Sequence, residues 1–154
     1  MQKVESTLQS LERRRSNIFH SSSTVFWCLV DKSKEIDTTI SFLNHFLLKR
    51  SIPSVSMRLS LRSMDGNLLK EISAELNEPI VYSYSVSDLL EDLKIDSGEF
   101  SIYIEFTSLE NLSVPFCAVV AEITSPTTLD LVHTYGRSLE SQEIGTFIDY
   151  RTSH

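Results

Sequence analysis

The residues best suited to acid–base or metal chemistry are four histidines, because an imidazole titrates close to neutral pH. They stand at positions 20, 45, 133 and 154, so the chain contains none of the local pairs HxH, HxxxH or HExxH. On an expected strand over 128–135, His133 shares a face with two leucines and a tyrosine, where it would serve as an acid, a base or a ligand. A small hydrolase or metal-dependent enzyme using His133 is therefore one alternative. Most histidines in such places are core or rim residues held by a hydrogen bond.

Carboxylates are abundant, but no spacing marks a catalytic pair. Glu105 and Glu122 fall on strands that we expect to be neighbours, and a glycosidase would need its two carboxyl groups about 5–10 Å apart. The simpler interpretation is that both carboxyl groups face outward from a sheet. The chain also lacks a glycine-rich phosphate loop and a GxSxG nucleophile elbow. We therefore expect a protein without catalytic residues, metal or cofactor.

Tyrosines beside charged residues suggest binding instead of catalysis. Flat aromatic rings cover apolar patches of a sugar or peptide, while neighbouring polar side chains bind hydroxyl groups. By analogy with other β-sandwich modules, carbohydrate is the favoured ligand. Tyrosine also commonly occupies half-exposed strand positions without any ligand. The alternative is a protein-interaction or oligomerisation domain, including a homo-oligomer, that uses an exposed sheet edge. The predicted ligand-binding residues are Tyr82, Tyr84, Tyr103, Tyr135, His133, Arg58, Arg62 and Glu105.

The elements that position these residues are predominantly strands. Residues 99–107 alternate strictly, with Phe100, Ile102, Ile104 and Phe106 on one face. Residues 55–76 predict a hairpin around Asp65-Gly66, whose wet face pairs arginines on one strand with glutamates on the other. With further strands at 80–84 and 128–135, this pattern predicts an all-β fold, an antiparallel β-sandwich of jelly-roll or immunoglobulin-like architecture.

Two apolar runs predict central strands that are buried on both faces. They are residues 24–30, which place Trp27 in the core, and residues 116–124. Residues 38–48 fit both the two-residue period of a strand and the 3.6-residue period of a helix, and two threonines and an isoleucine at the start favour the strand. Ser87 as an N-cap predicts a short helical crossover near 87–93.

The termini and the composition complete the prediction. Residues 1–23 form a polar leader with a short helix, 24–150 form the sandwich domain, and 144–150 are a last edge strand. The chain has 154 residues and a net charge of −7, which argues against a nucleic-acid-coating surface. It has no apolar run of about 18 residues and no visible signal peptide, so we expect a cytoplasmic protein without a membrane span that belongs to a larger protein or assembly. Cys28 and Cys117 are interpreted as buried apolar residues; a disulfide is the alternative.

Overall fold

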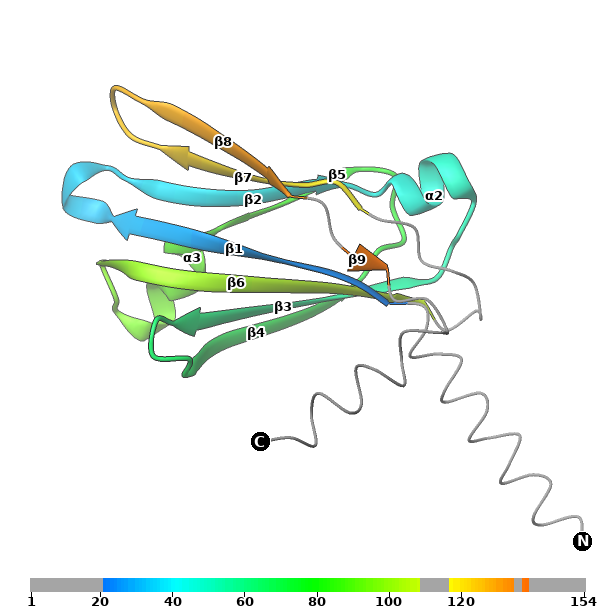
Figure 1. Cartoon of the computed structure of the whole chain (residues 1–154), viewed down its shortest axis with the longest axis horizontal. Helices are drawn as coiled ribbons and strands as arrows, with labels where there is room; N and C mark the ends of the chain where they lie inside the picture. Colours follow the sequence, from blue (N-terminus) through cyan, green and yellow to red (C-terminus); the bar gives the residue numbers. More distant parts are fainter. Residues whose placement is uncertain (1–20, 109–116, 135–136, 139–154) are drawn as a thin grey trace, which may run out of the picture.

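The computed structural model describes residues 21–108, 117–134 and 137–138, and these ranges form an antiparallel β-sandwich (Figure 1). Sheet A has the strand order β4-β3-β6-β1-β9, and sheet B has the order β5-β2-β7-β8. The strands are β1 (Ser21–Asp31), β2 (Asp37–Leu43), β3 (Val55–Ser63), β4 (Leu68–Glu75), β5 (Val81–Ser85), β6 (Ser97–Ser108), β7 (Val119–Thr124), β8 (Leu129–Thr134) and β9 (Arg137–Ser138). The predicted all-β sandwich is confirmed.

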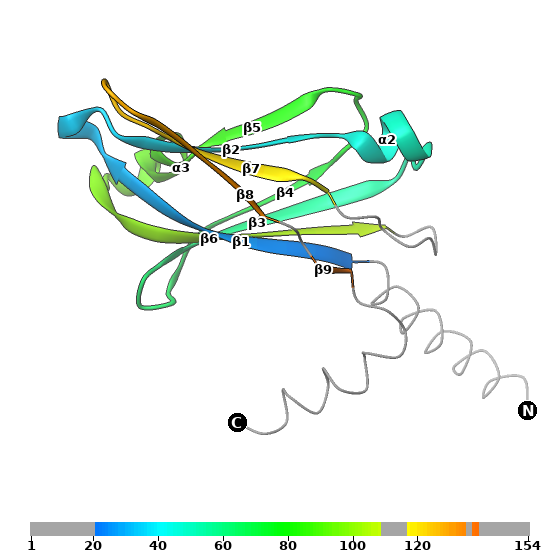
Figure 2. The ribbon, with the colours of Figure 1, turned by 45° about the horizontal axis from the view of Figure 1, so that its top comes forward.

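Short helical segments connect the strands at the ends of the sandwich. They are η1 (Lys32–Lys34), α2 (His45–Arg50), α3 (Val86–Leu90) and η2 (Glu91–Leu93). The crossover predicted near 87–93 is α3 with η2, and the N-cap is Ser85 in place of the expected Ser87, because the Ser85 hydroxyl accepts from the Asp88 N–H. Figure 2 shows the two sheets as separate layers, with α3 and α2 at opposite ends. The predicted N-terminal helix and the strand at 144–150 lie outside the described residues.

The core lies between the two sheets and follows the two-residue period of the strands. From β6 it takes Phe100, Ile102, Ile104 and Phe106, each at most 4% exposed. Cys28 and Cys117 are buried free thiols, as the first interpretation held. Among the described residues, no helix has the length and apolar character needed to cross a membrane.

The prediction that 24–30 is buried on both faces is wrong. In β1, Phe26, Cys28 and Val30 point into the core, whereas Val25 is 59% and Trp27 is 47% exposed. The outward residues look like core residues in the sequence because they too are apolar. The strand lies near one margin of sheet A, and none of the described strands forms a third layer over its outer face.

The second two-sided strand is also corrected. In β7 the residues Val119 and Ala121 are buried, but Val120 and Glu122 on the other face are only partly covered. β7 is central in its sheet, between β2 and β8, yet it has only one core-facing side. A central strand of a two-layer sandwich is covered on one face alone.

Residues 38–48 contain both of the structures that their pattern allows. β2 runs to Leu43, and α2 begins at His45. Asn44 is the boundary: it is fully buried, and its side-chain oxygen accepts the Leu47 N–H at 3.3 Å as the N-cap of the helix. The prediction of one strand is therefore right only for the first part of the segment.

The hairpin predicted at 55–76 is confirmed as β3 and β4, with Gly66 in the turn at φ +84°. Its charges pair differently from the expectation. Arg58 forms an ion pair with Glu105 of β6, at 2.6 Å, and Arg62 donates to the carbonyl of Gly66. The β4 glutamates bind hydroxyl groups of β3 instead, because β3 has a second neighbour, β6, that offers Arg58 a carboxylate directly opposite it.

Candidate functional site

The structure divides the predicted ligand-binding residues among three places. Arg58, Arg62, Tyr103 and Glu105 belong to the outer face of sheet A, as the β3–β6 register shows. Tyr82 and Tyr84 point into the sandwich, and His133 lies on the outer face of sheet B. Tyr135 lies outside the described residues. The eight residues therefore form no single surface, but four of them share one face.

The sequence suggested that Tyr82 and Tyr84 occupy polar-facing positions, but both side chains face the core. Both rings stack on the buried Phe42, with ring centroids 5.6 Å and 6.5 Å apart. Burial raises the pKa of the Tyr84 phenol above its ordinary value. β5 is an edge strand, so its inward rings close the open side of the core. These two tyrosines are packing residues.

His133 stands opposite Val120 on the β7–β8 pair, on the side of sheet B that faces away from the core. Glu122 shares that face, whereas Glu105 lies on the outer face of the other sheet, so the expected neighbourhood of the two glutamates is wrong. Within residues 21–108, 117–134 and 137–138, no group of three or more His, Cys, Asp and Glu side chains could hold a metal ion.

The outer face of sheet A gathers the remaining candidates around β6. Tyr103 lies between Val25 of β1 and Ser60 of β3, and Glu105 is the next outward residue along β6. Trp27 lies on the same face, two residues beyond Val25 along β1. We name this surface, which consists of Trp27, Val25, Tyr103, Arg58 and Glu105, the sheet A platform.

The platform contains one strong polar pair. A guanidinium nitrogen of Arg58 donates to Glu105 Oε2 at 2.6 Å, and this contact raises the pKa of Arg58 above its ordinary value. The Arg58 side chain is 51% exposed, and such ion pairs add little stability because water screens them. The pair is therefore better suited to presenting donors and acceptors than to holding the fold together.

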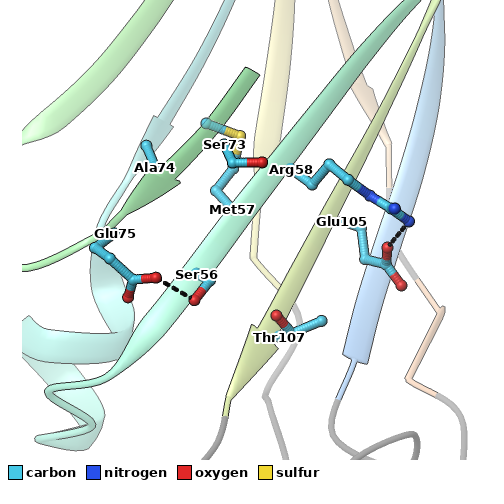
Figure 3. A pocket seen from close by; sticks show the side chains of 8 residues that line it. All are labelled: Ser56, Met57, Arg58, Ser73, Ala74, Glu75, Glu105 and Thr107. Atoms are coloured by element: carbon cyan, nitrogen blue, oxygen red, sulfur yellow. Dashed lines mark hydrogen bonds and ion pairs between the residues drawn. The ribbon is translucent and has the colours of Figure 1, made fainter. Parts of the chain in front are cut away.

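A hollow of about 470 Å³ adjoins this pair (Figure 3). Its wall combines a larger apolar part with several polar side chains, and the Ser56 hydroxyl donates to Glu75 Oε1 at 2.6 Å. The lining holds one guanidinium, that of Arg58, and two carboxylates, those of Glu75 and Glu105, so the local charge disfavours an anionic ligand. Hydroxyl and carboxylate groups there fit a ligand rich in hydroxyl groups. The hollow is lined by Ser56, Met57, Arg58, Ser73, Ala74, Glu75, Glu105 and Thr107.

Trp27 is the functional candidate that the sequence interpretation missed. Its indole N–H donates to Glu99 Oε2 at 3.3 Å, which holds the ring at the surface. The sequence carried no clear signal for its exposure: Trp27 has the same parity as Ser23 and Val25, but the opposite, core-facing parity also begins with a polar residue, Thr24, which is buried.

Comparison with known proteins supplies no family. No family model and no curated protein matches the sequence. The fold is similar to that of Thermotoga maritima 1070, with 12% identity and a TM-score of 0.49 over 79% of this chain and 95% of that chain. It is also similar to FlgD from Xanthomonas campestris, described for hook capping in flagellar assembly, with 8% identity and a TM-score of 0.34 over 81% and 75% of the two chains. Both likenesses are too distant to inform about a site or a ligand.

Proposed function

We propose that the chain is a non-enzymatic binding module that recognises a carbohydrate on the sheet A platform. The observation that carries the proposal is the combination of an exposed indole, a phenol and a charged hydrogen-bonding pair on one sheet face. Sugar rings stack their C–H faces on aromatic side chains and direct their hydroxyl groups to carboxylates and guanidinium groups. Trp27 and Tyr103 offer the first kind of contact, and Arg58 with Glu105 offers the second.

The size of the platform favours an oligosaccharide over a single sugar. Trp27 is in register with Ser101, four residues along β6 from Glu105. At about 3.4 Å per residue, this separation is roughly 14 Å along the strands. Tyr103 lies between the two ends, and the hollow continues past Glu105. The acidic balance around the hollow favours a neutral glycan over a sulfated or phosphorylated one.

The proposal is tested by screening the full chain against immobilised neutral oligosaccharides and titrating any hit in solution. We expect Trp27→Ala and Tyr103→Ala each to weaken binding at least tenfold. The matched control is Val81→Ala, which removes an exposed apolar side chain from the outer face of sheet B and should leave affinity unchanged. Circular dichroism and thermal melting would establish that each variant folds.

Two results would contradict the proposal. One is the absence of binding to any neutral glycan at millimolar concentration. The other is a glycan whose affinity is the same for Trp27→Ala, Tyr103→Ala and Val81→Ala, because the ligand would then occupy another surface.

A further inference from the structure

We propose that a second copy of this chain pairs antiparallel with β8, so that sheet B continues across a two-fold axis into an eight-stranded sheet. This proposal concerns an edge of sheet B and is independent of the sheet A platform. It follows from the backbone groups of β8, from the exposure of its side chains, and from the registers that its single charge permits.

The edge of β8 presents backbone groups to solvent at alternate residues. The Ser125 N–H donates to the Thr128 carbonyl at 2.9 Å, which sets the alternation of the β7–β8 hairpin. Hydrogen-bonded pairs then fall at Asp130 and Val132, because bonds to one neighbour recur at every second residue. Leu129 and Leu131 point their N–H and C=O groups away from β7. Within the described residues, no strand lies on that side. Only an extended chain presents donors and acceptors with this spacing.

The side chains of this edge are large and apolar. Leu131 is 63% exposed and Leu129 is 59% exposed, and both lie on the outer face of sheet B. Val132 points toward the inner face, opposite the buried Ala121 of β7, and is still 44% exposed. Long edge strands with exposed aliphatic residues associate unless charge or covering elements prevent it.

The β1 edge differs from β8 because other groups already bind much of it. Thr38 Oγ1 bonds both the N–H and the C=O of Leu29, at 2.9 and 2.8 Å, and β9 pairs with Ser22 and Ser23. At Asp31, backbone bonds to Ile36 close the far end.

The two remaining edge strands are protected in other ways. β4 carries Lys70, Glu71 and Glu75, and a register irregularity interrupts its pairing with β3. β5 is only one residue shorter than β8, but it exposes a single large apolar side chain, Val81, where β8 exposes three. Charge and irregularity protect an edge, and among the described edge strands β8 combines the most exposed apolar surface with a single charged side chain.

The sequence of β8 makes it a suitable partner for itself. In an antiparallel pair centred on Leu131, this leucine meets its own copy on the outer face, and Asp130 lies opposite the partner's Val132. A shift that centres the pair on Asp130 would instead place two carboxylates directly opposite each other, which is unfavourable. The charge therefore disfavours the register centred on Asp130, and in the register centred on Leu131 the exposed leucines of both copies become neighbours.

Sedimentation of the full chain over a range of concentrations tests the association. We expect a reversible dimer, with Leu131→Lys raising its dissociation constant at least tenfold. Leu68→Lys is the matched control, because Leu68 is 49% exposed on another edge strand and should leave the dimer unchanged. A monomer at every concentration would overturn the proposal, and the edge would then be open to an extended segment of a different protein. A dimer that is insensitive to Leu131→Lys would overturn it as well.

Cross-linking tests the register. In this register Leu129 of one copy lies opposite residue 133 of the other as a hydrogen-bonded pair, with Cα atoms about 5.5 Å apart, which suits a disulfide, and substitutions at these two positions keep Asp130. A mixture of Leu129→Cys and His133→Cys chains should oxidise to a covalent dimer at least tenfold faster than Leu129→Cys alone. Equal rates would contradict the register centred on Leu131. The native thiols should not interfere, because burial raises the pKa of Cys28 and of Cys117 to about 12.

Discussion

Asn44 joins three parts of the chain, and replacing it with alanine should destabilise the fold strongly. Its side-chain amide donates to the carbonyls of Leu76 and Glu78 at 3.0 and 2.9 Å, and its oxygen caps α2 by accepting the Leu47 N–H. The residue is fully buried. Asn44→Ala would remove all three bonds and leave the buried Leu76 carbonyl without its side-chain donor.

The magnitude follows from the hydrogen bonds. At about 1 kcal/mol for each bond, the three contacts amount to about 3 kcal/mol of unfolding free energy. A small domain is stable by about 5–15 kcal/mol, so this loss is large but leaves the variant folded. With a urea m-value of about 2 kcal/mol/M, the midpoint of unfolding should fall by about 1.5 M.

A second substitution separates hydrogen bonding from capping. Asn44→Asp keeps an oxygen for the Leu47 N–H, but its carboxylate would face the carbonyl oxygens of Leu76 and Glu78 in a buried site. It should therefore destabilise the fold more than Asn44→Ala does. Urea unfolding followed by circular dichroism measures both variants. Ser41→Ala, on the outward side of the preceding strand β2, is the control and should change stability by less than about 0.5 kcal/mol. A loss below about 1 kcal/mol for Asn44→Ala, or an aspartate that is tolerated better than alanine, would refute the reasoning.

Three further predictions concern thiols, fluorescence and acid stability. Burial raises the pKa of Cys28 and of Cys117 to about 12, so neither thiol should react with a thiol reagent at pH 8 in the native protein. Unfolding should make two thiols per chain reactive, and fast labelling of the native protein would contradict their burial. Trp27, the single tryptophan, is 47% exposed and should be quenched by iodide in the native state nearly as well as in urea, whereas a strongly protected indole would contradict its place on the sheet A platform. The Lys34 and Ser33 contacts lower the pKa of Asp31 to about 2, below its unfolded value of about 3.9. The ionised carboxylate therefore stabilises the fold fully above about pH 3.9, and this stabilisation is lost as the pH falls toward 2. The melting temperatures of wild type and Asp31→Asn should accordingly differ at pH 6 and converge near pH 2, and a constant difference would show that another interaction is responsible.

The strands that the sequence predicted correctly are those in which apolar and polar residues alternate. Residues 99–107 became part of β6 with their four apolar residues buried, because one face of the strand meets the core and the other meets water. The hairpin turn at Gly66 was predictable for a local reason as well, since its backbone has φ +84°. In both cases the pattern and the physical cause lie in the same few residues.

The failures occur where a local pattern satisfies two structures. Residues 38–48 contain a period-two face and a helical stripe, and a buried asparagine settles the choice through contacts with Leu76 and Glu78. Those partners are more than thirty positions away in the sequence. A local reading had no means of finding the residue that divides the strand from the helix.

The site was only partly predictable for the same reason. Arg58 and Glu105 were both selected from the sequence, but their contact joins β3 to β6 across 47 positions. Tyr82 and Tyr84 were assigned to a polar face, and only the β2–β5 register shows that they share the side of Phe42 and Ile40. Residue type indicates what a side chain can bind, whereas strand pairing decides which side chains meet.

The exposed apolar residues Val25 and Trp27 need an explanation that stability does not supply. A half-exposed indole with one bond to Glu99 gains little from its position, and large outward apolar side chains favour unwanted association. The same two residues flank Tyr103, and the Arg58–Glu105 pair lies beside it. Exposing these apolar side chains to water is unfavourable in the free module, and binding a ligand would cover them. This is the strongest reason to regard the sheet A platform as a recognition surface. If Trp27→Ser and Val25→Ser improve solubility without affecting any interaction of the chain, that reasoning fails.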